Sequence, residues 1–206
     1  AAAGLPVAPE VILKGRTELS EEEKQHLGLP VFVKPARGGS SIGVSKVNSW
    51  EEFPAAVDLA LEDDEKILVE PEIVGQEVEI GVLHYADGTL LASVPALLAG
   101  IDDSDEGFYG FDTKYLDNVV TAEIPAPFTP ELTEKLRDMA VRAFEALNCE
   151  GLSRVDFFVT EDSVYINEIN TLPGFTPISM YPQVLAASGV EYPALLEALI
   201  EQALAK

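Results

Sequence analysis

The chain has 206 residues and 47% of them are hydrophobic, enough for one large domain or two small ones with a hydrophobic core. It carries 36 acidic against 13 basic residues, a formal net charge of -23, which disfavours a nucleic acid or an anionic membrane as partner because both need a basic face. No apolar run approaches about 18 residues, so no transmembrane span is expected. The single cysteine, Cys149, fits a reducing compartment, and we expect a cytoplasmic protein.

The first half of the chain shows strand patterns around one helix. An apolar segment before the Gly/Ser loop ARGGSSIGV is typical of a short strand. Ser49 and Glu52 have the spacing of a capping box, which predicts a helix from there to about Glu62. Alternating polar and apolar residues indicate further strands. The expected strands span residues 30–35, 66–70 and 77–83, and the last is followed across a turn by a hairpin partner at 89–97.

The second half begins with the acidic, glycine-containing segment 102–110, which predicts a mobile loop. Thr129 as cap and Pro130 at the first position predict a helix that runs to about Leu147. Hairpins and helices come in separate runs and not in strict βαβ alternation, which indicates the α+β class. The remaining elements expected are strands near 153–159 and 163–168 and a last helix over 192–205.

Polar side chains on the two late strands form a candidate metal site. Arg154 and Asp156 lie two residues apart, and Glu168 and Asn170 follow on the next strand, before the loop LPGFTPIS. Carboxylate and carboxamide oxygens suit Mg²⁺ bound to polyphosphate, because this hard ion takes few protein ligands. The guanidinium supplies a fixed cationic fork beside them. Each residue alone is more typical of a solvated strand face, but the four together favour a site.

The Gly/Ser loop after the first strand is a second candidate. Its glycines let backbone N–H groups approach phosphate oxygens, its serines add donors, and Lys34 lies at the end of the preceding strand. The order of residues is neither that of a P-loop nor that of a Rossmann fingerprint. Taken alone, this segment slightly favours a Gly-rich hairpin turn without a ligand.

Five phrases in series carry a family resemblance. VFVKPARGGSSIGVSKV, ILVEPEIVGQEVEIGVL, FYGFDTKYL, GLSRVDFFV and INEINTLPGFTPISMYP resemble D-alanine–D-alanine ligases of the ATP-grasp superfamily, in that family's order and over essentially the whole chain. The resemblance implies an ATP-grasp fold of two α+β lobes with ATP bound between them. Residues 1–83 would form the smaller lobe, with the phosphate loop and the hinge, and residues 84–206 the larger lobe, with the metal and substrate site.

The resemblance also implies roles for individual residues. Arg154, Gly174, Ser40, Tyr115 and Lys114 would be catalytic. ATP would be held by Lys34, Ser41, Glu70, Ile73, Glu77, Phe108, Lys114 and Phe158. Asp156, Glu168 and Asn170 would hold Mg²⁺ or Mn²⁺, and Ser179 and Met180 would meet the acceptor substrate.

The implied reaction joins two D-alanines, through an acyl phosphate made from ATP, into a peptidoglycan precursor, in a full-length homodimer. Two departures from the family pattern affect these expectations. The family begins with a further N-terminal domain, so the chain resembles a fragment that would be inactive alone. Pro71 and Glu72 lie where a lysine or an aromatic residue is common, which weakens the expected adenine contacts there. Two alternatives stay open: an ATP-grasp ligase for another carboxylate–amine pair, and a nucleotide-binding module without catalysis.

Overall fold

A computed structural model describes residues 1–37, 41–99, 121–176 and 178–205. Its described residues divide into two compact units: the small unit, residues 8–74, and the large unit, residues 1–7, 75–99 and 121–205. The sequence placed the boundary after Leu83, whereas the structure divides after Val74. The reason is that the strand β5 (Gln76–His84) pairs along most of its length with β9 (Leu152–Val159) inside the large unit. The predicted mobile loop 102–110 lies outside the described residues.

The small unit is a four-stranded antiparallel sheet in the order β1-β4-β2-β3 with helices packed on one face. Alternation along β2 turns Val31 and Val33 into the core and leaves Phe32 and Lys34 on the opposite face. The expected strands at 30–35 and 66–70 are confirmed. The elements are β1 (Val11–Lys14), α1 (Glu21–Leu27), β2 (Val31–Pro35), β3 (Ser45–Val47), α2 (Phe53–Leu61) and β4 (Lys66–Pro71).

The capping box expected at Ser49 is wrong as a helix start. The helix α2 begins at Phe53 with Glu52 at its N-cap position, and the chain before it forms turns. Pro54 explains the difference, because a helix that began at Ser49 would require the missing proline N–H to donate inside the helix. Glu52 still accepts backbone hydrogen bonds from the N–H of Asn48 and Ser49, at 2.9 and 3.2 Å.

The small unit does contain a capping box, at a helix that the sequence analysis missed. Ser20 Oγ accepts from the backbone N–H of Glu23 at 3.2 Å, and the Glu23 carboxylate accepts from the N–H of Ser20 at 2.8 Å. Arg16 pairs with the same carboxylate and, together with the Ser20 N–H, lowers the pKa of Glu23 to about 2. The serine and the glutamate three residues later were the signal that could have found α1.

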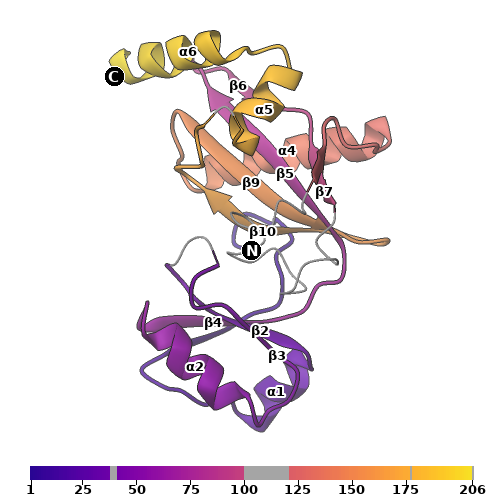
Figure 1. The fold of residues 1–206 in the computed structure, drawn as a ribbon, viewed down its shortest axis with the longest axis vertical. Coiled ribbons are helices and arrows are strands. Elements are labelled where there is room, and N and C mark those ends of the chain that lie inside the picture. Colours follow the sequence, from indigo (N-terminus) through magenta and orange to yellow (C-terminus); the bar gives the residue numbers. More distant parts are fainter. Residues whose placement is uncertain (38–40, 100–120, 177, 206) are drawn as a thin grey trace. The chain divides into compact units, whose positions relative to one another are not determined.

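The large unit is built on an antiparallel sheet in the order β10-β9-β5-β7-β8, with β6 paired to β5. The helix α4 packs on β5 and β9, whereas α5 and α6 pack on β5 around Leu83 (Figure 1). The expected strands near 77–83, 153–159 and 163–168 are confirmed, as are the helices near 129–147 and 192–205. The elements not yet given are β6 (Leu90–Ala92), β7 (Ala96–Ala99), β8 (Thr121–Glu123), α4 (Pro130–Ala146), β10 (Val164–Asn170), α5 (Met180–Ala187) and α6 (Tyr192–Leu204).

The hairpin partner expected over 89–97 is wrong as a single strand, because it is broken into β6 and β7. Ser93 lies in the break and is fully buried. Its Oγ accepts from the N–H of Gly81 at 2.9 Å, and its own N–H donates to the carbonyl of Gly81 at 2.8 Å. The side chain thus replaces a backbone acceptor, and the ladder is interrupted without leaving the Gly81 N–H unsatisfied.

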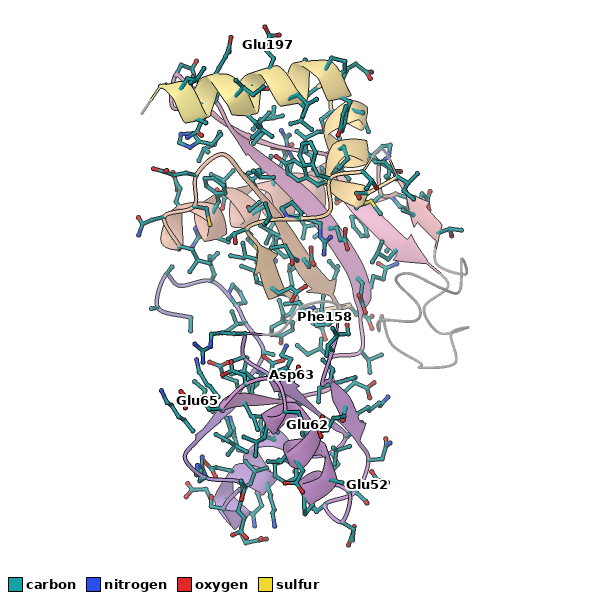
Figure 2. All side chains as sticks on the ribbon, turned by 60° about the vertical axis from the view of Figure 1, so that its left-hand side comes forward. Glu52, Glu62, Asp63, Glu65, Phe158 and Glu197 are labelled. Carbon is teal, nitrogen blue, oxygen red and sulfur yellow. The ribbon has the colours of Figure 1, made fainter. Side chains whose placement is uncertain are left out.

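The acidic excess of the chain is carried in part by exposed side chains. Glu52, Glu62 and Glu197 are exposed, and Figure 2 shows them on the surface of their respective units. Among the described helices, none combines the length and the hydropathy needed to cross a bilayer.

Candidate active site

Register in the large-unit sheet brings the predicted metal residues together with Arg154. Asp156 on β9 lies opposite Glu168 on β10, and Arg154 lies opposite Asn170. On the other side of β9, Glu79 of β5 is opposite Asp156. Because directly opposite residues project to the same side of a sheet, these five side chains share one face, opposite to α4. We call them the acidic cluster.

A bulge in β10 decides that Glu168 belongs to this face. Ile166 pairs with Phe157 and Glu168 pairs with Asp156, so Asn167 is an extra residue between them. Ile166 and Phe157 both lie in the core under α4. With regular pairing of the same residues, Glu168 would have fallen opposite Val155 and pointed into that core. The bulge therefore separates Ile166 from Glu168, although their spacing of two predicts the same face.

Arg154 and Asp156 form a bidentate pair within the acidic cluster. Nε of Arg154 donates to Oδ1 at 2.7 Å, and Nη2 donates to Oδ2 at 2.6 Å. Burial by itself would lower the pKa of the guanidinium, but the hydrogen bonds to Asp156 and the charges of Asp156, Glu79 and Glu168 outweigh it and raise the pKa. Arg154 therefore keeps its positive charge in a half-buried position surrounded by carboxylates.

Asn170 links the two carboxylates expected to bind metal. Its Nδ2 donates to Asp156 at 3.0 Å and to Glu168 at 3.1 Å, so the three side chains meet at one point. A half-turn of the amide exchanges its nitrogen and oxygen and would present three oxygen ligands there. An oxygen-only set with few protein ligands is what Mg²⁺ requires, so the residues present fit this ion.

Glu79 is a member of the cluster that the sequence analysis missed. It lies on β5, far from Arg154 in sequence, and only 4% of its side chain is exposed. Its Oε2 forms an ion pair with Nε of Arg154 at 3.1 Å. The alternation EVEIGVL marked the strand, but nothing in the sequence placed this acid opposite Asp156.

The loop between β10 and α5 holds Gly174, Ser179 and Met180. Ser179 is the N-cap residue of α5, and its Oγ accepts from the N–H of Thr176 at 3.0 Å. A Cβ added to Gly174 would lie 3.0 Å from Oγ of Ser179, so the glycine allows this loop to fold closely on itself. Met180 begins α5 and packs partly into the core beneath it. The loop follows directly after Asn170 in the chain.

In the small unit, Lys34 and Glu70 form an ion pair at 2.5 Å on the sheet face opposite to α2. On the same face Lys46 pairs with Glu72 at 2.6 Å, and the Lys46 ammonium lies 6.0 Å from the ring centre of Phe32. Both lysines are partly buried, which places fixed cations on an otherwise partly apolar surface. Such a surface suits a ligand with an aromatic part and phosphates.

The start of the Gly/Ser loop is anchored to the small unit by an arginine. Nε and Nη2 of Arg37 donate to the buried Asp64 at 3.0 and 2.7 Å. Asp64 Oδ1 also accepts from the N–H of Lys66 at 3.1 Å. These contacts lower the pKa of Asp64 far below its ordinary value, with the Arg37 hydrogen bonds as the largest cause.

The other predicted site residues are placed as follows. Ser41 has a positive φ of 57°, which is uncommon for a residue with a side chain. Ile73 follows β4 in the small unit, and Glu77 on β5 lies opposite Phe158 on β9 in the large unit; all three are half-buried. Figure 2 labels Phe158 on the large-unit sheet. Ser40, Phe108, Lys114 and Tyr115 lie outside the described residues.

Comparison with solved structures defines the class of protein. A D-alanine–D-alanine ligase from Coxiella burnetii superposes with a TM-score of 0.83 at 35% identity, covering 98% of this chain and 53% of that one. The VanG D-Ala:D-Ser ligase from Enterococcus faecalis gives a TM-score of 0.80 at 33% identity, covering 98% of this chain and 58% of that one. The predicted α+β class and ATP-grasp fold are confirmed.

Sequence comparison then identifies the family. The family model described as D-ala D-ala ligase C-terminus matches residues 1–201, and the chain belongs to this family. A curated D-alanine–D-alanine ligase of Corynebacterium efficiens is 66% identical over 99% of this chain. One of Mycolicibacterium smegmatis is 51% identical over 100% of this chain. In both cases the match covers 56% of the relative, so the chain spans about half the length of these proteins.

Proposed function

We propose that the chain is the ATP-grasp portion of a cytoplasmic D-alanine–D-alanine ligase that makes a peptidoglycan precursor and is a homodimer at full length. The acidic cluster carries this proposal, because it combines an oxygen ligand set with a fixed guanidinium on one sheet face. Support for the choice of substrate comes from the ligases named above, which are similar over nearly the whole chain.

The chemical difficulty of the reaction explains why such a cluster is needed. The carboxylate of the first D-alanine must attack the γ-phosphate of ATP and displace ADP, so two anions have to approach each other. Asp156, Glu168 and Asn170 would hold Mg²⁺ or Mn²⁺, which when bound neutralises charge on the transferring phosphoryl group. Arg154 adds a second positive charge beside them, and its position is fixed by Asp156 before any substrate arrives.

The second half-reaction uses the same face. The amine of the second D-alanine attacks the acyl phosphate, and negative charge develops on oxygen as the tetrahedral intermediate forms. The intermediate then collapses to the peptide bond, with release of inorganic phosphate and of the amine proton. Arg154 and the backbone N–H of Gly174 would donate to this oxygen. Ser179 and Met180, which begin α5, would meet the carboxylate of the acceptor. The N–H groups at the start of a helix favour an anionic group there.

The small unit would hold the nucleotide. Lys34 would bind the α- and β-phosphates, and the backbone and serines of the Gly/Ser loop, with Ser40 and Ser41, would cover the phosphates. The sheet face that carries Phe32, opposite to α2, offers an apolar surface for the base. Adenine contacts at Glu70 and Ile73, a ribose contact at Glu77 and packing by Phe108 and Phe158 complete the proposal. Lys114 would reach the γ-phosphate, and Tyr115 would close a loop over Ser40.

A different acceptor is the second candidate. The VanG neighbour is a D-Ala:D-Ser ligase with the same fold and 33% identity, so the fold accommodates another second substrate. A nucleotide-binding module without ligase activity is the third, but the described members of the site keep their charged groups: Lys34, Arg154, Asp156 and Glu168. These candidates differ in product, and one assay separates them.

The test measures phosphate release and dipeptide by mass spectrometry with the full-length protein, ATP and D-alanine, alone or with D-serine or D-lactate. D-Alanyl-D-alanine should be the main product. Glu168→Gln should abolish Mg²⁺-dependent turnover without unfolding the protein, because it removes a ligand charge. Glu161→Gln is the matched control, since Glu161 lies exposed in the turn of the same hairpin. Full activity of Glu168→Gln would refute the metal assignment, and absence of any ligation would leave the nucleotide-binding module.

A further inference from the structure

Glu79 is the one carboxylate of the acidic cluster that the proposed mechanism does not use. It is 3% exposed, on the central strand β5, and faces Asp156 across the ladder. Burying a carboxylate is unfavourable unless a positive partner lies beside it. The Arg154 guanidinium, itself 16% exposed at the side chain, is that partner. The buried carboxylate of Glu79 is therefore a candidate for a functional role.

The geometry of the guanidinium indicates what the role is. Asp156 accepts from Nε and Nη2 of Arg154, and Glu79 lies at 3.1 Å from the same Nε. Asp156 therefore holds one edge of the planar group by two hydrogen bonds, and Glu79 adds an ion pair, not a hydrogen bond, at the same edge. Within the described residues, Nη1 on the other edge has no hydrogen-bond partner. A planar group held at one edge presents its remaining donors in a fixed direction.

We propose that Glu79 is a positioning residue for Arg154: it fixes the Nε edge of the guanidinium so that Nη1 is directed to the phosphoryl and acyl oxygens of the substrates. The inference rests on the proposed ligase function. Asp156 cannot do this alone once it also serves the metal, because its oxygens are then shared between the ion and the guanidinium. Glu79 keeps the arginine in place while the Asp156 contacts change.

A role for Glu79 as a further metal ligand fits the burial less well. Mg²⁺ retains several waters when it binds to proteins, and it therefore needs access from solvent. Glu168 and Asn170 lie at the more open side of the cluster, where Glu168 is exposed. Glu79 lies on the opposite side of β9 with 4% of its side chain exposed, and it forms an ion pair with Arg154.

A double-mutant cycle with the full-length protein tests whether Glu79 acts through Arg154. Glu79→Gln keeps the volume and removes the charge; it should lower kcat on the order of a hundredfold and change KM for ATP by less than about threefold, because misdirecting a positioned group acts on the transition state. In an Arg154→Met background, the same substitution should change kcat by less than about threefold. Should Glu79→Gln fail to fold, Glu79→Asp takes its place, because the shorter side chain keeps the charge but withdraws it from Nε.

A stability-matched control separates positioning from a general weakening of the sheet. Tyr181 OH donates to the carbonyl of Val82 on β5 at 3.0 Å, and Tyr181 is buried. Tyr181→Phe removes this buried hydrogen bond from the same strand and leaves the charged groups around Arg154 unchanged. It should lower the melting temperature, leave kcat within about threefold, and combine additively with Arg154→Met.

A readout without substrates completes the test. The Nε–Hε NMR signal of Arg154, assigned by its loss in Arg154→Met, should shift or broaden in Glu79→Gln and stay in place in Tyr181→Phe. An unmoved signal, or multiplicative effects of Glu79→Gln and Arg154→Met on kcat, would overturn the positioning role. A wild type that forms no dipeptide would overturn the proposed function. An active wild type in which the two substitutions act independently on kcat would overturn only the role of Glu79.

Discussion

Gly81 on β5 offers a quantitative test of the packing that supports the sheet face with the acidic cluster. It lies opposite Arg154 in the ladder and beneath α5. A Cβ added here would lie 2.4 Å from Cδ2 of Leu185 and 3.1 Å from the ring of Tyr181. Both neighbours are buried, at 0% and 1% exposure, and Tyr181 is further held by its hydrogen bond to Val82. Neither side chain can move outward to make room.

The expected loss of stability follows from this overlap. Carbon atoms pack best at about 3.5–4.0 Å, so the new methyl overlaps Leu185 by more than about 1 Å. Overpacking of this kind destabilises a core by about 1–3 kcal/mol, and Gly81→Ala should therefore lower the unfolding free energy of the large unit by about 2 kcal/mol. Replacing Leu185 by alanine removes the clashing atom, so Gly81→Ala should have less effect in that background.

Hydrogen exchange on β5 and β9 amides is the suitable assay, because it reports the large unit directly. The single tryptophan, Trp50, lies in the small unit, and its fluorescence-detected unfolding provides an internal control that should not change. A loss below about 0.5 kcal/mol in Gly81→Ala, or additive effects of Gly81→Ala and Leu185→Ala, would refute the packing argument.

Three further predictions concern local features of the two units. Ser20→Ala should destabilise the small unit by about 1 kcal/mol in a urea titration followed by Trp50 fluorescence. Ser49→Ala should have less than about half that effect, because only Ser20 caps a helix. Equal losses in the two variants would contradict this assignment. Deleting Asn167 should leave the large unit folded, as measured by circular dichroism, because only the extra residue of the bulge is lost. Deleting Ile169 should destabilise the large unit by at least about 3 kcal/mol, because it turns Asn170 into the core. A larger loss from the Asn167 deletion than from the Ile169 deletion would refute the register. Asp64→Asn should lower the free energy of unfolding at neutral pH, and the difference from wild type should shrink on acidification below about pH 4. The reason is that the pKa of Asp64 in the folded state lies below its ordinary value, so the stabilisation is lost as the carboxylate protonates. A constant difference from pH 7 to pH 2 would contradict the ion pair with Arg37.

The sequence by itself determined the elements whose signals are local. Thr129 and Pro130 predicted the start of α4, and the structure has that helix at Pro130–Ala146 with Thr129 Oγ1 accepting from the N–H of Leu132 at 3.2 Å. Alternation predicted β5 and β9 to within a residue or two at each end. The α+β class followed from the order of such elements. A cap or an alternating strand depends on a few consecutive residues, so it can be recognised without knowing what packs against it.

The same kind of signal failed where two local rules competed. Ser49 and Glu52 satisfied the capping pattern, but Pro54 lacks the N–H that a helix starting there would need, and α2 begins at Phe53. At Ser93, a buried hydroxyl that bonds to Gly81 divides an apparently continuous strand. In both places several neighbouring backbone groups need hydrogen-bond partners at the same time, whereas a sequence pattern predicts one such hydrogen bond by itself.

Only the tertiary structure decided which residues form the acidic cluster. Residues 154, 156, 168 and 170 were identified from the sequence, but regular alternation would have put Ile166 on the same face as Glu168, and the bulge at Asn167 separates them. Glu79 joined the site because β5 pairs with β9 across a long stretch of chain. Register between strands depends on the whole sheet and on the helix that covers it, and a shift of one residue exchanges the two faces. The residues that carry charge were therefore visible in the sequence, whereas the contacts that orient them were fixed by the fold.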